Sequence, residues 1–247
     1  MSWSLMMKTF EPKQISLPWR LPDAVKCCTV LYGVEVDPDV FAQQTRIIPE
    51  HSLEGAVASR RLEYYQGRYC AKKAMSWSDD RWFHLTRAGD RQPQWPQDMV
   101  GSISHTRLQC GSQGFAGALV ADRKVMRAVA FDAESVIAEQ RVQGIRKQVC
   151  HQADRGASDF QEAVWTTIVF SAKESVYKLL YPLCEKKFWF GDAAVTVRPD
   201  YSWKAELLIE LNDALPQGFV VEGRWCHDDR GLIYTSCYLA NNSQSYH

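Results

Sequence analysis

The run Phe170-Ser171-Ala172-Lys173-Glu174-Ser175-Val176-Tyr177-Lys178 lies inside a long helical pattern in the second half of the chain. This pattern begins near Ser158-Asp159-Phe160-Gln161, which resembles a capping box, and we expect it to end at Pro182. Residues four apart lie one above the other on a helix, so Glu174 and Lys178 should share one face. We therefore expect one long helix to organise the second half of the chain.

A second motif, Phe131-Asp132-Ala133-Glu134, precedes that helix. Asp132 and Glu134 are two apart, so in a strand both side chains leave by the same face. With Glu174 they make three carboxylates, and Lys178 adds one ammonium. Because hard divalent cations take oxygen ligands and keep water or phosphate in the remaining positions, the pattern predicts a magnesium and phosphate site with Asp132, Glu134 and Glu174 as ligands. Taken singly, the same residues are typical of solvated strand ends and an exposed helix ion pair.

Around these motifs the chain divides into two halves of similar plan, with a boundary at Asp122-Arg123-Lys124 that gives residues 1–123 and 124–247. In the first half we expect strands over 28–36, 101–105 and 115–121 and a helix over 53–77 with Ser52 as its N-cap. The rest of residues 1–50 is punctuated by proline and should be irregular. In the second half we expect strands over 128–132, 195–197, 205–211, 219–224 and 232–239.

Composition excludes several classes of function. Lys plus Arg and Asp plus Glu balance at 29 each, which argues against a general binder of nucleic acid or membrane surfaces. No apolar run approaches the roughly 18 residues that a membrane span needs, and residues 1–10 lack the apolar core of a signal peptide. We expect a soluble, cytoplasmic protein whose anion site is local.

The eight cysteines form no C-x-x-C pair. Cys150-His151 and Cys226-His227 are adjacent pairs, which is not the spacing of zinc ligands. We expect reduced, mostly buried thiols and no structural zinc.

Several segments together resemble one enzyme family. Three blocks, Gly101-Ser102-Ile103-Ser104-His105, Asp132-Ala133-Glu134 and the run over 170–178, look like the signature blocks of the phosphopantetheinyl transferases of the surfactin type. Three further segments are similar to the enterobactin synthase component D branch: Arg60-Arg61-Leu62-Glu63, Gly67-Arg68 and Gly89-Asp90-Arg91-Gln92-Pro93-Gln94-Trp95-Pro96. Each block alone is weak, but the blocks follow the family order over roughly residues 60–180. The chain departs from the family at Ala130 and Ala133, and neither change removes a ligand.

The resemblance implies both a fold and a reaction. The fold would be an α+β monomer in which two similar subdomains are related by a pseudo-twofold axis, with coenzyme A in the cleft between them. The reaction would transfer phosphopantetheine from coenzyme A to a serine hydroxyl of an apo carrier protein, with Mg²⁺ as cofactor and adenosine bisphosphate as the other product. The implied partners are carrier proteins or domains of peptide, polyketide or fatty-acid synthases, and the branch suggests siderophore or other nonribosomal peptide synthesis.

The residues suit this chemistry. Attack on a diphosphate needs charge neutralisation, which three carboxylates and their metal would supply. Glu174 is placed to take the serine proton, directly or through a metal-bound water, and Lys178 to meet the released phosphate. The expected coenzyme A contacts are Arg60, Arg68, Arg91, Ser104, His105 and Lys178. Arg60 and Arg68 are eight apart, nearly one helix face, and guanidinium groups pair well with phosphate oxygens.

Two alternatives stay open at this point. One is a non-catalytic protein that binds coenzyme A or another nucleotide, which would not require the Glu174 and Lys178 pair. The other is an interaction protein that needs no metal.

A possible carrier-docking surface follows Glu134, where residues 136–149 mix apolar residues with Arg141, Arg146 and Lys147. An acidic carrier helix would complement it. In the alternative reading, its apolar residues merely pack on the core.

Overall fold

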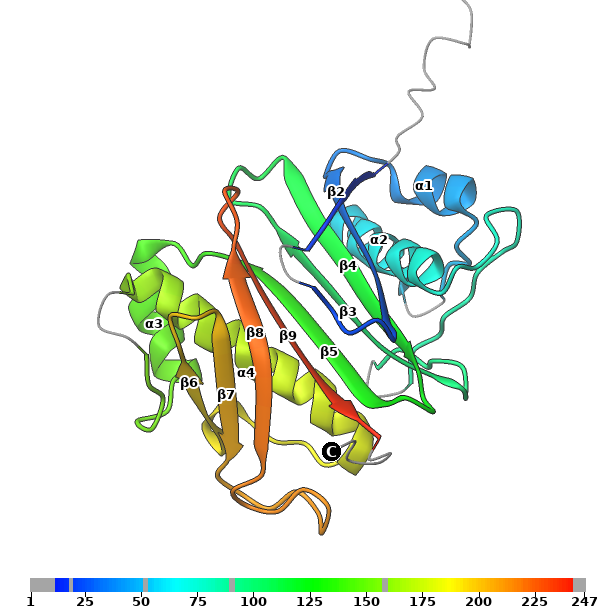
Figure 1. Ribbon diagram of the computed structural model, residues 1–247. Helices are drawn as coiled ribbons and strands as arrows, with labels where there is room; N and C mark the ends of the chain where they lie inside the picture. The colour runs from blue at the N-terminus through cyan, green and yellow to red at the C-terminus, as the bar shows by residue number, and fades with distance from the viewer. Residues whose placement is uncertain (1–11, 18–19, 51–52, 89–91, 157–159, 242–247) are drawn as a thin grey trace, which may run out of the picture.

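The computed structural model describes residues 12–17, 20–50, 53–88, 92–156 and 160–241 (Figure 1). They form two antiparallel sheets. The first has the order β1 (Lys13–Ile15), β2 (Val25–Gly33), β4 (Gln113–Asp122), β3 (Met99–Arg107). The second has the order β5 (Met126–Ser135), β9 (Leu232–Ala240), β8 (Val220–His227), β7 (Ser202–Leu207), β6 (Ala193–Val197). The expected α+β class is confirmed.

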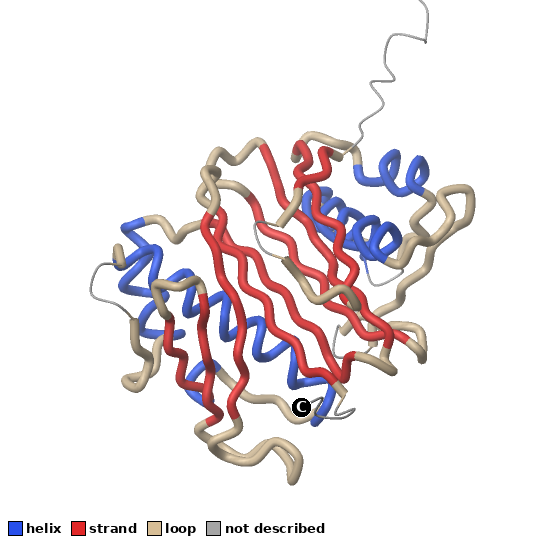
Figure 2. The backbone as a smooth tube through the Cα atoms, in the orientation of Figure 1, coloured by secondary structure: helices blue, strands red, loops and turns tan. Residues whose placement is uncertain are grey.

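Each sheet is covered by one long helix (Figure 2). The helices are α1 (Pro38–Thr45), α2 (Ala58–Ala74), α3 (Glu139–Val149) and α4 (Glu162–Cys184), with a short 3₁₀ turn, η3 (Phe190–Asp192). Leu62 and Tyr65 of α2 pack against the first sheet at Ala118. Ile168 and Leu179 of α4 belong to the core of the second sheet. Because α2 and α4 pack their apolar faces on the two sheets, polar residues on their other faces can line the cleft between the two halves.

The two sheets meet edge to edge at β3 and β5, and hydroxyl groups of β3 make the join. Ser102 Oγ accepts a hydrogen bond from the Phe131 backbone N–H at 3.2 Å and donates to the Phe131 carbonyl at 3.3 Å. Ser104 Oγ accepts from the Ala133 N–H at 3.1 Å. Among the described strands, β3 and β5 share no backbone ladder. Because side chains in a strand alternate, the serines at period two line one face and act in place of a ladder.

Aromatic packing supports the same seam from the interior. Phe115 of β4 meets Phe131 edge to face with ring centroids 6.1 Å apart, and meets Tyr234 of β9 at 5.3 Å. Gly117 lies under the Phe131 ring, and a Cβ atom there would come within 2.7 Å of it. The absence of a side chain at Gly117 thus allows the second sheet to approach the first.

Several sequence predictions need correction. Pro182 does not end the long helix, which runs two residues further to Cys184 with a left-handed cap at Glu185, because a proline near a helix end forfeits only one hydrogen bond. The segment before residue 50 contains a helix that we did not predict, α1, with Asp37 capping its N-terminus. The helix expected over 53–77 begins at Ala58. The proposed caps Ser52 and Ser158 lie outside the described residues.

Lys173, inside the signature run, serves the fold. Its ammonium is buried, pairs with Asp154 at 2.8 Å and donates to the carbonyls of Val149 and Phe190 at 2.9 and 2.8 Å. Asp154 in turn accepts from the backbone N–H of Val195 at 2.6 Å. This ion pair therefore joins α4 to the end of α3 and to β6.

We predict that Lys173→Met lowers the free energy of unfolding by about 3–5 kcal/mol, because it leaves the buried Asp154 charge unpaired. Urea denaturation measures the effect. Lys147→Met, an exposed change on α3, is the matched control and should stay within about 0.5 kcal/mol of the parent. A loss below about 1 kcal/mol in Lys173→Met would contradict the buried-pair account.

Candidate active site

A cleft of about 560 Å³ lies between the two sheets. Its walls come from α2 (Arg60, Tyr64, Arg68) and from α4 (Glu174, Tyr177, Lys178), and His105 of β3 also lines it. A cleft of this size suits a nucleotide-sized ligand. Of the nine predicted site residues, these five contribute to its walls: Arg60, Arg68, His105, Glu174 and Lys178.

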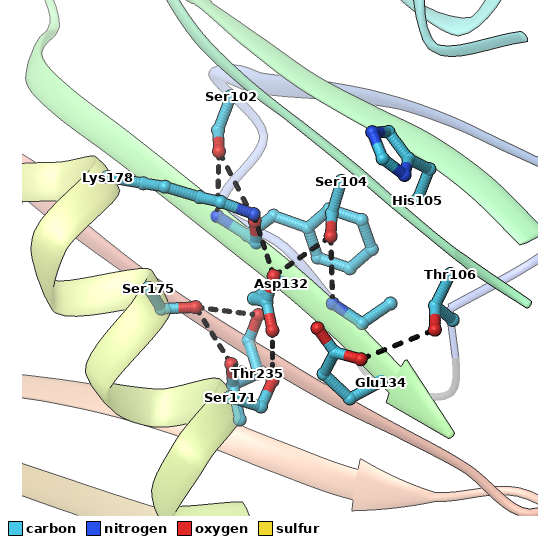
Figure 3. A network of polar contacts seen from close by, with 12 residues as sticks. Ser102, Ser104, His105, Thr106, Asp132, Glu134, Ser171, Ser175, Lys178 and Thr235 are labelled. Carbon is cyan, nitrogen blue, oxygen red and sulfur yellow. Dashed lines mark hydrogen bonds and ion pairs between the residues drawn. The ribbon is translucent and has the colours of Figure 1, made fainter. Parts of the chain in front are cut away.

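At the seam below the cleft, Asp132 is the centre of a polar network (Figure 3). Its side chain is 3% exposed. Oδ1 accepts from Lys178 Nζ at 2.7 Å and from Ser104 Oγ at 2.9 Å, and Oδ2 accepts from Ser171 Oγ at 2.8 Å. The side chain of Lys178 is 26% exposed. Lys178 is therefore the donor that can leave Asp132 most easily.

The other two carboxylates, Glu134 and Glu174, have no cation paired with them among the described residues, and the pKa of each is raised. Burial and the Asp132 charge raise the pKa of Glu134 to about 8, against the opposing effects of Lys178 and of a hydrogen bond from Thr106. Burial and Asp132 also raise the pKa of Glu174. The three carboxylates thus interact electrostatically with one another, and Lys178 is the single ammonium group near them. The described residues include no three His, Cys, Asp or Glu side chains that already converge as a metal shell. The donor set nevertheless fits a hard divalent cation, since every donor is a carboxylate oxygen and the negative charge is in excess.

The opposite wall of the cleft is basic. The Arg68 guanidinium lies 4.1 Å from the centre of the Tyr64 ring, and its Nε donates to the Leu85 carbonyl at 3.1 Å. Its Nη2 is buried and has no hydrogen-bond partner among the described residues. An unpartnered buried guanidinium nitrogen beside a cleft is suited to an anionic ligand, because its donor otherwise stays unsatisfied.

The sequence analysis missed Arg87. This residue also lines the cleft, with its guanidinium 5.1 Å from the centre of the Tyr64 ring, and it pairs with Glu50 at 2.9 Å. The only signal in the sequence was a second cation four residues before Arg91. Arg91 itself lies outside the described residues.

His105 is held in one tautomer. Arg60 Nη1 lies 3.1 Å from His105 Nε2, and because a guanidinium only donates, Nε2 must accept. The proton then sits on Nδ1, which faces Glu63 Oε2 at 3.9 Å. Burial and the nearby cations Arg60 and Lys178 lower the pKa of His105 to about 4, with Glu63 opposing. His105 is therefore neutral at pH 7.

The predicted phosphate contact of Ser104 stays a prediction, and the structure gives its hydroxyl other partners. We expected its hydroxyl to contact phosphate, but the hydroxyl is buried, donates to Asp132 and accepts from the Ala133 N–H. It does not line the cleft. The sequence motif that contains Ser104 does not show toward which face of β3 its side chain points.

A smaller pocket of about 250 Å³ adjoins the cleft. Phe188, Trp189 and Phe190 form its apolar wall, and Glu174 and Tyr177 line both the pocket and the cleft. The sequence analysis did not find this pocket, because residues 188–190 carry no motif. Its position makes Glu174 the meeting point of a basic cavity and an apolar one.

The segment proposed for carrier docking forms α3. Val142 and Val149 are buried, whereas Arg141 and Lys147 are exposed. Arg146 pairs with Glu162 and lies 5.5 Å from the centre of the Trp165 ring. The helix is therefore amphipathic, as the alternative reading required, and its outer face remains a prediction for docking.

Comparisons with known proteins agree with this geometry. The family described as 4'-phosphopantetheinyl transferase N-terminal domain matches residues 48–121, and the 4'-phosphopantetheinyl transferase superfamily matches residues 128–227. The chain belongs to this superfamily. It is 30% identical over 205 residues to 4'-phosphopantetheinyl transferase PptT of Mycobacterium tuberculosis, covering 78% of this chain and 86% of that protein. It is 31% identical over 207 residues to 4'-phosphopantetheinyl transferase Svp of Streptomyces mobaraensis, covering 78% and 79%. It is 32% identical over 154 residues to enterobactin synthase component D of Salmonella austin, covering 60% of each chain.

The family resemblance inferred from the sequence is thereby confirmed. This phosphopantetheinyl transferase is an enzyme that modifies carrier proteins with phosphopantetheine from coenzyme A. The alternative of a non-catalytic nucleotide-binding protein is not supported. Among the described residues, none of the helices combines the length and apolar content that a bilayer crossing requires.

We predict a pH dependence of stability from Glu134. Its pKa is about 8 in the folded protein against an ordinary value of 4.5, so in that window the folded state binds more protons than the unfolded state. Its contribution is present below about pH 4.5 and is lost as the pH rises through about 8. In EDTA, urea midpoints of the parent should fall over this range, and Glu134→Gln should flatten the curve. Glu139→Gln, an exposed change, should leave the slope as it is. Identical slopes in the parent and Glu134→Gln would contradict the assignment.

Proposed function

We propose that coenzyme A lies along the cleft, that Asp132, Glu134 and Glu174 hold Mg²⁺, and that Glu174 and Lys178 carry the transfer to the carrier serine. The observation behind this proposal is that Glu174 and Tyr177 line both cavities. Coenzyme A has phosphates at one end and a slender arm at the other. A basic cleft that shares Glu174 and Tyr177 with an apolar pocket matches that asymmetry.

Charge sets the orientation of coenzyme A. The basic wall receives the ribose phosphate: Arg68 offers its unpartnered Nη2, and Arg60 and Arg87 lie on the same side of the cleft. The diphosphate then reaches Lys178, and the pantetheine arm enters the pocket walled by Phe188 and Phe190. Guanidinium groups pair with phosphate oxygens through two parallel hydrogen bonds, which suits the ribose phosphate to this wall.

The residues around the reacting phosphate divide the chemistry. When bound, Mg²⁺ supplies positive charge to the diphosphate oxygens. Glu174 takes the proton from the carrier serine as its oxygen forms a bond to phosphorus and the bond to the adenosine bisphosphate oxygen breaks. Lys178 leaves Asp132 and donates to the departing phosphate.

The remaining features of the proposal concern setting and partners. The relatives named enterobactin synthase component D favour carriers of nonribosomal peptide synthesis, including siderophore synthesis. We further propose a cytoplasmic monomer with subdomains at residues 1–123 and 124–247. The sheets divide between Asp122 and Met126, and the eight cysteines are free thiols, as in a reducing compartment.

Intact-mass measurement of an apo carrier protein tests the function and the metal together. With coenzyme A and Mg²⁺ the carrier should gain one phosphopantetheine. Asp132→Ala should nearly abolish that gain while the unfolding curve stays cooperative, and added Mg²⁺ should not restore it. Turnover near that of the parent in Asp132→Ala would show that the metal assignment is wrong, and a panel of apo carriers would identify the preferred partner.

Ligand preference tests the basic wall. Arg68→Ala should weaken coenzyme A binding by roughly tenfold to a hundredfold, the value of a charge-assisted contact of about 1.5–3 kcal/mol, with little effect on dephospho-coenzyme A. Arg60→Ala should act in the same direction. Arg61→Ala is the matched control on the same helix, since Arg61 pairs with Asp39 at 2.8 Å and does not line the cleft. Calorimetry with both ligands measures the preference. If the ratio of the two dissociation constants in Arg68→Ala equals that of the parent, the ribose phosphate does not bind at this wall.

A further inference from the structure

Behind Asp132, three buried hydroxyl groups form a continuous chain into the second sheet. Ser171 and Ser175 lie one turn apart on α4, and Thr235 faces them from β9; all three residues are 0% exposed. Ser171 Oγ lies 2.8 Å from Asp132 Oδ2 and 2.9 Å from Thr235 Oγ1. Ser175 Oγ lies 2.8 Å from Thr235 Oγ1 (Figure 3).

The direction of the hydrogen bonds follows from the partners. The Asp132 carboxylate paired with Lys178 can only accept, so Ser171 must donate its single proton to Oδ2. Ser171 then accepts from Thr235, and Thr235 accepts from Ser175. Every proton in the chain points toward Asp132. Such chains strengthen each member by polarisation, and burial strengthens them further.

The hydroxyl chain also gives the two carboxylate oxygens of Asp132 different hydrogen-bond partners. Within the described part of the chain, Oδ2 accepts only from the buried Ser171, whereas Oδ1 accepts from Ser104 and from the partly exposed Lys178. When Lys178 moves away, Oδ1 loses a donor while Oδ2 keeps its own. The hydroxyl chain therefore holds the carboxylate in one orientation whatever the position of Lys178.

We propose that Thr235 and Ser171 are positioning residues for Asp132, and that the hydroxyl of Thr235, which lies on a strand without any signature motif, supports metal binding at a distance. The inference rests on the proposed role of Asp132 as a metal ligand. Partners that orient a metal ligand commonly affect metal affinity or activity by about 10-fold to 100-fold.

The chain offers a matched control. Thr166, also on α4, is 0% exposed, and its hydroxyl has no hydrogen-bond partner among the described residues. Thr→Val keeps the shape and removes the hydroxyl at either position. Only at Thr235 does that hydroxyl connect to Asp132.

The test measures Mn²⁺ binding to the protein without coenzyme A, by the free-ion signal in electron paramagnetic resonance, together with the apparent Mg²⁺ constant of the transfer reaction. Thr235→Val should weaken Mn²⁺ binding and raise the Mg²⁺ constant by about 10-fold to 100-fold. Thr235→Ser, which keeps the hydroxyl, should restore both, and Thr166→Val should match the parent. If Thr235→Val does not yield folded protein, Ser175→Ala removes the outer donor and should shift both constants in the same direction.

Two results would overturn the inference. One is a Thr235→Val protein whose unfolding midpoint falls while both metal constants stay within about twofold of the parent. The hydroxyl would then stabilise only the packing of α4 on β9. The other comes from Asp132→Asn. If this variant binds Mn²⁺ as tightly as the parent, Asp132 is not a metal ligand, and the inference fails with that assignment. If Asp132→Asn loses Mn²⁺ and Thr235→Val does not, the proposed function stands and this inference alone falls.

Discussion

Two serine hydroxyl groups of β3 join the two sheets along β5, and the positions of the cleft and of Asp132 follow from this seam. Ser102 and Ser104 bind the backbone of Phe131 and Ala133 where a sheet would use its own ladder. The seam sets the distance between the halves, and therefore the width of the cleft above it. It also sets the register between two signature blocks, so that the end of β3, with His105, lies beside Asp132. Binding residues from one half and acidic residues from the other then face a common space.

The acidic side of that space has three carboxylates and one nearby ammonium group. Asp132 has Lys178 and two hydroxyl donors, while Glu134 and Glu174 are half-buried and form no ion pair among the described contacts. Lys173, the other lysine of the signature run, is engaged with Asp154 in the core. One lysine thus stabilises α4 and the other is available at the site. Their five-residue spacing turns them to different faces of the same helix.

Local periodicity explains which parts of the site could be predicted. Asp132 and Glu134 share a strand face, and Glu174 and Lys178 share a helix face, so spacing alone placed them together. Arg87 could not be found in this way, because its approach to Tyr64 and Glu50 depends on how a loop folds over α2. The contacts of Ser104 with Asp132 and Ala133 could not be predicted for a related reason: they depend on the position of β5 relative to β3. Among the fold elements, α1 was missed because prolines masked a helix whose cap, Asp37 before Pro38, is itself a start signal.

The seam also bears on the solubility of the folded chain. β3 and β5 are both edge strands, and an exposed edge presents unpaired N–H and C=O groups to any other strand it meets. Here each edge shields the other, with serine hydroxyls occupying groups that would otherwise be open to strand addition. Separation of the two sheets would expose both edges at once, each with its row of unsatisfied backbone groups. The packing of β3 on β5 thus protects two strand edges from other strands as well as assembling the cleft.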